Sequence, residues 1–155
     1  MVGVFHRIGV YSPQDFTNPI EQILAFEGTV TFDGIYVSVF EHRGQLAKRK
    51  PLLFISGDQI GREGFCNKEQ LLELKALGFT LGWHGWSHRR LNEIDDEQKR
   101  LELRRPDWVE PMYAYPHGDF DDRSIMALKA YGYERAYSTT QGESDNEYAI
   151  IRQYI

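Results

Sequence analysis

Short apolar runs alternate along the chain with longer segments in which apolar residues recur at helical spacing. The short runs are rich in Val, Ile, Phe and Tyr, which is typical of strands. Seven such runs cover residues 2–8, 28–33, 51–56, 79–83, 112–115, 135–139 and 149–154. The segments between them are expected to be helical, so the pattern predicts a regular alternation of strand and helix.

Local start and stop signals mark several of the helical segments. A Ser-Pro pair at 12–13 predicts an N-cap followed by proline at the first helical position. Asn67 resembles the start of a capping box, and Gly78 ends that helix. Asp119 is expected to cap the last helix. Two further helical segments are expected at residues 37–50 and 95–105.

This alternation predicts an α/β fold, built as one domain over residues 1–155 with a mostly parallel sheet. Seven strands suit a (β/α)7-type barrel that is distorted or incomplete. In parallel barrels the functional site is built at the carboxyl ends of the strands. Four polar residues lie at or just past such ends, and together they form a candidate site: His6, Asp33, His84 and His117.

Composition narrows the class of protein. The 155 residues are 41% hydrophobic and 26% charged, which is ordinary for a soluble globular domain. The net charge of −5 disfavours nucleic acid as a partner. Cys66 is the only cysteine, the N-terminus does not resemble a signal peptide, and no apolar stretch is long enough for a membrane span. We therefore expect a cytoplasmic protein.

Metal binding is the first chemistry that the candidate residues suggest. His84 and His88 are four residues apart, so a helical turn or tight loop presents both imidazoles on one side. Imidazole is a preferred zinc ligand, and a carboxylate such as Asp33 can join as ligand or act as a general base. The alternatives are two packing histidines at a helix start and an Asp-Gly turn at position 33.

Other polar and aromatic residues offer further roles. His6 can act as an acid or base near neutral pH, or can simply hydrogen-bond at a strand end. Residues 113–119 run from a strand into a proline-fixed turn, which can aim a backbone N–H at an oxyanion or only connect strand to helix. Trp83, Trp86 and Tyr115 can form a wall for stacking sugars, or belong to the core.

Three segments in order resemble the motifs of the polysaccharide deacetylase family (NodB-homology domain, carbohydrate esterase family 4). Residues 31–36, T-F-D-G-I-Y, resemble the first motif, T-F-D-D-G-Y. Residues 84–88 resemble the second, H-[ST]-x-x-H, and residues 113–119 are similar to the F-A-Y-P-Y-G-D form of the third. Residues 5–8 resemble the Y-H-R-I opening of the subgroup that contains the biofilm poly-N-acetylglucosamine deacetylases.

The resemblance implies metal-assisted removal of an N-acetyl group from an amino sugar, as a monosaccharide, oligosaccharide or polysaccharide. His84 and His88 would hold a divalent ion, zinc in the first instance, with cobalt or nickel as alternatives. Asp33 would take the proton of the attacking water. His6 would protonate the leaving amine. The oxyanion and substrate would meet three residues of the third motif, with the backbone N–H of the last as donor: Tyr115, Pro116 and His117.

One position departs from the family pattern. Gly34 stands where the first motif has its second aspartate, a metal ligand, so either the ligand or the base is missing unless a residue such as Asp58 or Asp119 replaces it. The alternative function is therefore a catalytically degenerate module that binds a sugar or a protein, and a third is hydrolysis of a non-sugar amide. The segment 104–106 is short for the family and is expected to leave an open groove. The oligomeric state is left open.

Overall fold

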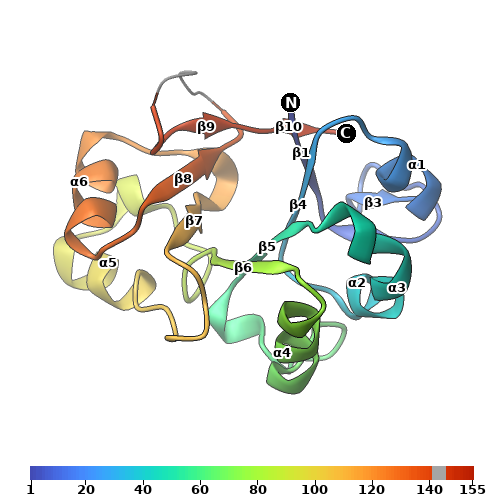
Figure 1. The fold of residues 1–155 in the computed structure, drawn as a ribbon. Coiled ribbons are helices and arrows are strands. Elements are labelled where there is room, and N and C mark those ends of the chain that lie inside the picture. Colours follow the sequence, from blue (N-terminus) through green and yellow to red (C-terminus); the bar gives the residue numbers. More distant parts are fainter. Residues whose placement is uncertain (141–145) are drawn as a thin grey trace.

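The computed structural model describes residues 1–140 and 146–155, and a sheet of eight parallel strands lies at its centre (Figure 1). The order across the sheet is β10-β1-β4-β5-β6-β7-β8-β9. The strands are β1 (Val2–Phe5), β4 (Thr29–Asp33), β5 (Leu52–Ile55), β6 (Thr80–Trp83), β7 (Met112–Ala114), β8 (Arg135–Ser138), β9 (Ile150–Ile151) and β10 (Gln153–Tyr154). All seven predicted runs contribute to this sheet, which confirms the predicted α/β barrel-like fold.

The last run of strand brings the two ends of the sheet together. β9 pairs with β8, whereas β10, only one residue later, pairs with β1 through Gly3↔Gln153 and Val4↔Tyr154. The predicted strand 149–154 is thus divided at Arg152, where it passes from one sheet edge to the other. Figure 1 shows the sheet curled into a nearly closed barrel, with β10 beside β1. A buried side chain at this crossing enters the barrel, which positions the site described below.

Helices and short turns connect the strands on the outside of the barrel. They are α1 (Ile20–Ala25), α2 (Val37–Glu41), α3 (Arg43–Leu46), η1 (Ala47–Arg49), η2 (Gly57–Gln59), α4 (Lys68–Ala76), η3 (Leu91–Glu93), α5 (Asp96–Glu102), η4 (Pro116–Gly118) and α6 (Asp122–Ala130). Asn67 forms the predicted capping box of α4 with Gln70. The segment expected to be one helix over 37–50 is instead three consecutive short helices.

Two predicted helix starts are wrong. No helix begins at Pro13, because Ser12 pairs with Thr17 in a β-bridge and the chain then forms β3 (Thr17–Asn18), which pairs with β2 (Arg7–Ile8). Proline disfavours helical geometry in the preceding residue, so α1 starts only after Pro19. Asp119 does not cap α6 either; its carboxylate binds Arg90. Asp121 is the cap.

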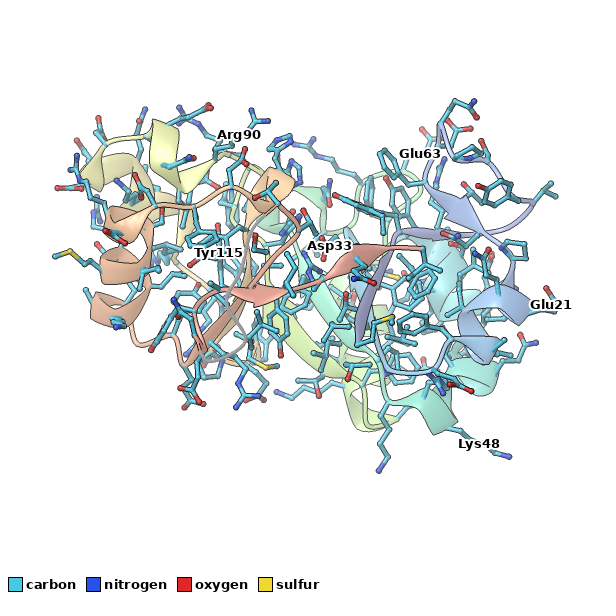
Figure 2. The ribbon with its side chains drawn as sticks, turned by 90° about the horizontal axis from the view of Figure 1, so that it is seen from above. Glu21, Asp33, Lys48, Glu63, Arg90 and Tyr115 are labelled. Carbon is cyan, nitrogen blue, oxygen red and sulfur yellow. The ribbon has the colours of Figure 1, made fainter. Side chains whose placement is uncertain are left out.

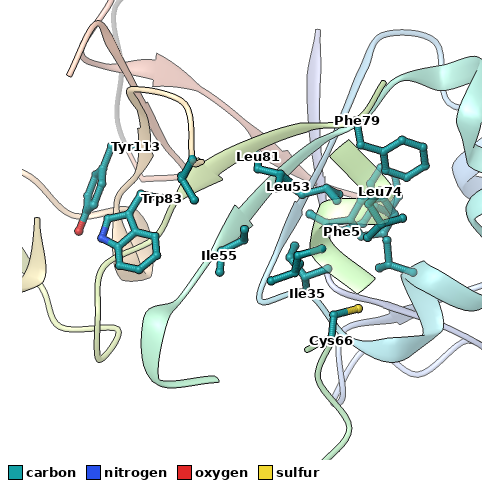
Figure 3. Close-up of a cluster of buried hydrophobic side chains, with 14 of the residues drawn as sticks. Phe5, Ile35, Leu53, Ile55, Cys66, Leu74, Phe79, Leu81, Trp83 and Tyr113 are labelled. Carbon is teal, nitrogen blue, oxygen red and sulfur yellow. The ribbon is translucent and has the colours of Figure 1, made fainter. Parts of the chain in front are cut away.

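The buried apolar side chains form two clusters: a large one, drawn in Figure 3, and a small one of Phe54, Ala114 and Tyr137. Trp83 and Tyr113, labelled at one end of the cluster, are fully buried on the paired strands β6 and β7. Phe5 on β1, Leu53 on β5 and Leu81 on β6 belong to the same cluster. The packed interior leaves the carboxyl edge of the sheet as the place where polar groups gather. No helix in the described part of the chain is long and apolar enough to cross a membrane.

The buried thiol gives a prediction for alkaline pH. Cys66 is 1% exposed, and burial raises the pKa of its thiol from 9.0 to about 11. The thiol of the unfolded chain ionises near pH 9, whereas the buried thiol of the folded protein stays protonated until about pH 11. The free energy of unfolding is therefore unaffected below pH 9 and falls as the pH rises from 9 towards 11. Two pKa units correspond to roughly 3 kcal/mol in the free energy of unfolding.

Urea unfolding of the wild type and of Cys66→Ala at pH 8 to 11 measures this loss of stability. A shift of one pKa unit corresponds to ~1.4 kcal/mol in the free energy of unfolding. The variant loses packing at every pH, so the slopes against pH are compared rather than the absolute values. We expect the wild type to lose stability more steeply. Equal slopes would show that the thiol does not contribute.

Candidate active site

The carboxyl edge of the sheet brings the predicted site residues together. His6 follows β1, Asp33 ends β4, His84 follows β6, and His117 lies in the turn after β7. His84 Nε2 lies 3.9 Å from Asp33 Oδ2. The His88 ring lies against the His84 ring, with 4.7 Å between centroids. Figure 2 places Asp33 near the middle of the molecule, with Glu21 and Lys48 at the periphery.

Asp33 is held by a buried arginine that the sequence analysis did not single out. Both guanidinium ends of Arg152 donate to the carboxylate, from Nη1 to Oδ1 at 2.6 Å and from Nη2 to Oδ2 at 2.8 Å. Nη1 also donates to Thr31 Oγ1 at 3.2 Å, and the guanidinium lies over the Phe54 ring. Burial alone would raise the pKa of Asp33, but Arg152 outweighs it and holds that pKa well below 3.8. The carboxylate is therefore ionised at neutral pH.

The position of Arg152 follows from the closure of the barrel. Its backbone N–H donates to Ser138 O of β8, and the next residue already pairs with β1. The side chain is 1% exposed, and its interior position at the crossing lets it reach Asp33 on β4. A signal was present in the sequence: a charged residue interrupts the apolar run 149–154. A charge inside a buried strand needs a partner of opposite sign.

His84 is oriented by the strand beside it. Its Nδ1 lies 2.7 Å from Ala114 O on β7. A carbonyl oxygen can only accept, so Nδ1 carries the proton and Nε2 keeps its lone pair towards Asp33. Burial lowers the pKa of His84 to about 4 against the attraction of Asp33, so the ring is neutral at physiological pH. A neutral imidazole with its far nitrogen anchored to a carbonyl is the usual arrangement of a metal-ligating histidine.

The loop that carries both histidines of the second motif is fixed from two sides. Ser87 donates from its backbone N–H to Glu102 Oε2 at 2.9 Å and from its hydroxyl to Glu102 Oε1. On the other side, Asp58 N–H donates to Trp86 O at 2.8 Å. A side chain at Gly57 would overlap the Trp86 ring, so that glycine permits the indole to pack on η2. The buried carboxylate of Glu102 is a second positioning group that the sequence analysis missed.

His6 follows β1, which pairs with the strand that carries Asp33. Its ring stacks on Tyr154 and contacts Phe16, with centroid distances of 6.1 and 5.1 Å. Burial lowers the pKa of His6, and the nearby charge of Asp33 opposes this. The imidazole is therefore partly shielded, close to the carboxylate, and neutral at physiological pH.

The third-motif segment forms a sharp turn after β7. Tyr115 and Pro116 are buried, whereas His117 is exposed and has a left-handed backbone, with φ of 60°. Tyr115 stacks on Phe120 and donates its hydroxyl to Tyr148 O. Through these two contacts the Tyr115 side chain anchors the turn to the core.

Of the two roles open to the three aromatic rings, a sugar-stacking wall or the core, two rings take the second. Trp83 and Tyr115 are core residues, and only Trp86 is exposed, at 50%. Trp86 borders a groove of about 470 Å³ whose other lining residues are Leu101, Arg104, Arg105 and Pro106. This groove lies at the short segment 104–106, where an open groove was expected.

The donors available to a metal are fewer than the family motif provides. Gly34 has a positive φ of 65° and no side chain, and both Asp33 oxygens are bonded to Arg152. Within residues 1–140 and 146–155, no three His, Cys, Asp or Glu side chains are arranged to hold a metal ion. His84 Nε2 and the adjacent His88 ring are the nitrogen donors already in place.

Comparison with known proteins places the chain in a family. The model of the family described as polysaccharide deacetylase matches residues 29–136. The chain belongs to the polysaccharide deacetylase family. The matched stretch contains Asp33, His84, His88 and His117, whereas His6 and Arg152 lie outside it.

Relatives of known name support this assignment to the polysaccharide deacetylases. YxkH of Bacillus subtilis (strain 168), a curated protein named after this family, is 23% identical over 137 residues. That match covers 79% of this chain but 49% of YxkH, so the chain spans about half the length of this relative.

Solved structures share the fold. Streptococcus pyogenes deacetylase PplD, solved with acetate, is 16% identical, with a TM-score of 0.80 over 99% of this chain and 91% of that one. IcaB from Ammonifex degensii is 19% identical, with a TM-score of 0.75 over the same shares. BC0361, a polysaccharide deacetylase from Bacillus cereus, is 20% identical, with a TM-score of 0.77 over 99% of this chain and 64% of that one.

Proposed function

We propose that the chain is a metal-dependent hydrolase that removes an N-acetyl group from an amino sugar or polysaccharide. The observation that carries the proposal is the pair of Asp33 and His84 in a member of the polysaccharide deacetylase family. Asp33 is kept ionised by Arg152, and His84 presents an unprotonated nitrogen beside it. Metal-assisted hydrolysis requires a fixed general base, here Asp33, next to an imidazole that can bind the metal, here His84.

The residues fit a divalent ion with His84 and His88 as nitrogen ligands. The hydrogen bond from His84 Nδ1 to Ala114 O fixes the ring with Nε2 available, which supports this role. Zinc suits imidazole ligands, and cobalt and nickel are alternatives. When bound, such an ion polarises the acetamide carbonyl and acidifies water.

The chain's own residues divide the proton transfers. Asp33 accepts the proton of the attacking water. Its lowered pKa makes it a weak base, so the reaction depends on a water that is already acidified. His6, near Asp33, takes up a proton from solvent and delivers it to the leaving amine, and Asp33 then releases to solvent the proton that it took from water. The turn of Tyr115, Pro116 and His117 presents the His117 backbone N–H to the developing oxyanion.

Gly34 favours the second candidate, a catalytically degenerate module that binds a sugar or a protein. The family's carboxylate ligand is absent at this position, and the backbone has the left-handed geometry that suits glycine. Such a module would keep its ligand affinity when the metal is removed. The exposed Trp86 beside the groove supplies a sugar-stacking surface in either case.

Acetate release tests the two candidates. The protein is stripped with chelator, reloaded with zinc, cobalt or nickel, and incubated with N-acetylated amino sugars from monosaccharide to polymer. We expect acetate release with at least one metal and none after chelation. No acetate from any substrate, together with unchanged binding of an oligosaccharide after chelation, would support the binding module instead.

A further inference from the structure

Three imidazoles form a continuous row across the ends of β6 and β7. The ring centroids of His84 and His88 are 4.7 Å apart, and those of His88 and His117 are 4.6 Å apart. The row runs outward from a buried ring through a half-buried ring to an exposed one. Ala114, on the strand that leads to His117, also fixes His84 through its carbonyl. Two neighbouring strands therefore build the row together.

The backbone is strained at two of the three histidines. His88 and His117 have φ of 59° and 60°, in the left-handed region that non-glycine residues seldom occupy. Each costs about 1–2 kcal/mol relative to ordinary geometry. Both turns are held by neighbours: Ser87 is bound by Glu102, and Gly118 O accepts from Ser138 and Thr140 hydroxyls at 2.7 and 2.9 Å. These contacts hold His88 and His117 in strained backbone conformations, with their two rings next to each other.

A third metal ligand is needed, and two of the nearby carboxylates are already bonded to arginines. Asp33 has both oxygens on Arg152, and Asp119 accepts from Arg90 at 2.7 Å. Asp58 is half-buried on η2 and contacts Arg62 at 3.5 Å, so it is the rival ligand that the variants below test. His117 is exposed, so its side chain can rotate towards the other two rings without leaving a cavity.

We propose that His117 is the third nitrogen ligand of a divalent ion held by His84 and His88. The side chain turns inward to complete a three-histidine site, which leaves one position for water, as in catalytic zinc sites. His117 thereby replaces the carboxylate that Gly34 lacks, while its backbone N–H stays in the turn. The inference rests on the metal dependence proposed above, but its test requires no turnover.

Direct metal binding is the test. Zinc affinity is measured by competition with a chromophoric chelator, and cobalt coordination by its visible absorption, for the wild type and His117→Ala. Loss of an outer-shell partner already weakens metal binding about 10- to 100-fold, so we expect at least ~100-fold for this ligand. The cobalt bands should weaken and shift, because a nitrogen is replaced by water.

Further variants separate ligation from strain and from a rival ligand. His117→Gly suits the left-handed backbone, so it should fold at least as well as the wild type yet lose metal affinity like His117→Ala. His42→Gln and Asp58→Asn should keep wild-type affinity. The proposal is overturned if both His117 variants bind metal like the wild type, if Asp58→Asn alone loses it, or if the wild type binds none. Acetate release, measured separately, decides the proposed function whichever result is obtained.

Discussion

Replacing Asp33 by asparagine is expected to lower kcat/KM for acetate release by about 10²- to 10⁴-fold, the usual contribution of a general base. The amide cannot accept a proton at neutral pH, although its oxygen can still accept one hydrogen bond from Arg152. Metal affinity should stay within a few-fold of the wild type, because Asp33 is proposed as base and not as ligand. The measurements are steady-state kinetics and zinc competition on the same preparation.

The variant leaves a buried guanidinium without its full partner, so some loss of stability is expected. Kinetics are therefore recorded at a temperature where circular dichroism shows both proteins folded. Glu73→Gln removes an exposed carboxylate that forms a surface ion pair with Arg43, and should retain wild-type rates. If Asp33→Asn loses metal and activity together, Asp33 is a ligand and the base must be sought elsewhere.

Replacing Arg152 by methionine is expected to lower the free energy of unfolding by about 3–5 kcal/mol, because it leaves an unpaired carboxylate in the barrel. For a domain of this size the melting temperature should fall by roughly 6–20 °C. The pKa of Asp33 should rise, since burial then acts without the guanidinium that opposes it. The acid limb of the activity profile should move to higher pH. Thermal unfolding and a pH–rate profile check both effects.

Two comparisons isolate the pair. The double variant Asp33→Asn/Arg152→Met removes both charges and should regain part of the lost stability, which gives the coupling by a double-mutant cycle. Arg123→Met removes a guanidinium that is 70% exposed and bonds Asp96 on the surface, so it should change stability by less than about 0.5 kcal/mol. A similar loss in both arginine variants would mean that the buried pair contributes nothing special.

Local patterns predicted most of the fold because each depends on nearby residues. The seven apolar runs and the capping box of Asn67 needed no knowledge of the tertiary structure. The Ser-Pro signal at 12–13 failed because Pro19 and the pairing of Ser12 with Thr17 override it. Asp119 failed as a cap because its carboxylate binds Arg90, far away in sequence.

The part of the candidate site that lies at the ends of predicted strands could be predicted from the sequence. In a parallel sheet these ends meet at one edge, and this brought His6, Asp33, His84 and His117 to the same region. Arg152 could not be placed this way, because its role depends on which strands border the final one. The roles of these residues in metal binding and catalysis remain predictions.

Closure of the barrel by β9 and β10 also has a consequence for the order of folding. The pairing of β10 with β1 joins the most distant strands of the described chain, and such non-local contacts have the largest loop-closure cost. A late intermediate would contain most of the sheet but lack the Arg152–Asp33 contact. Pulsed hydrogen exchange should then find the β1 amides that face β10 protected last. Such an intermediate would be compact yet inactive, so activity should return more slowly than secondary structure during refolding.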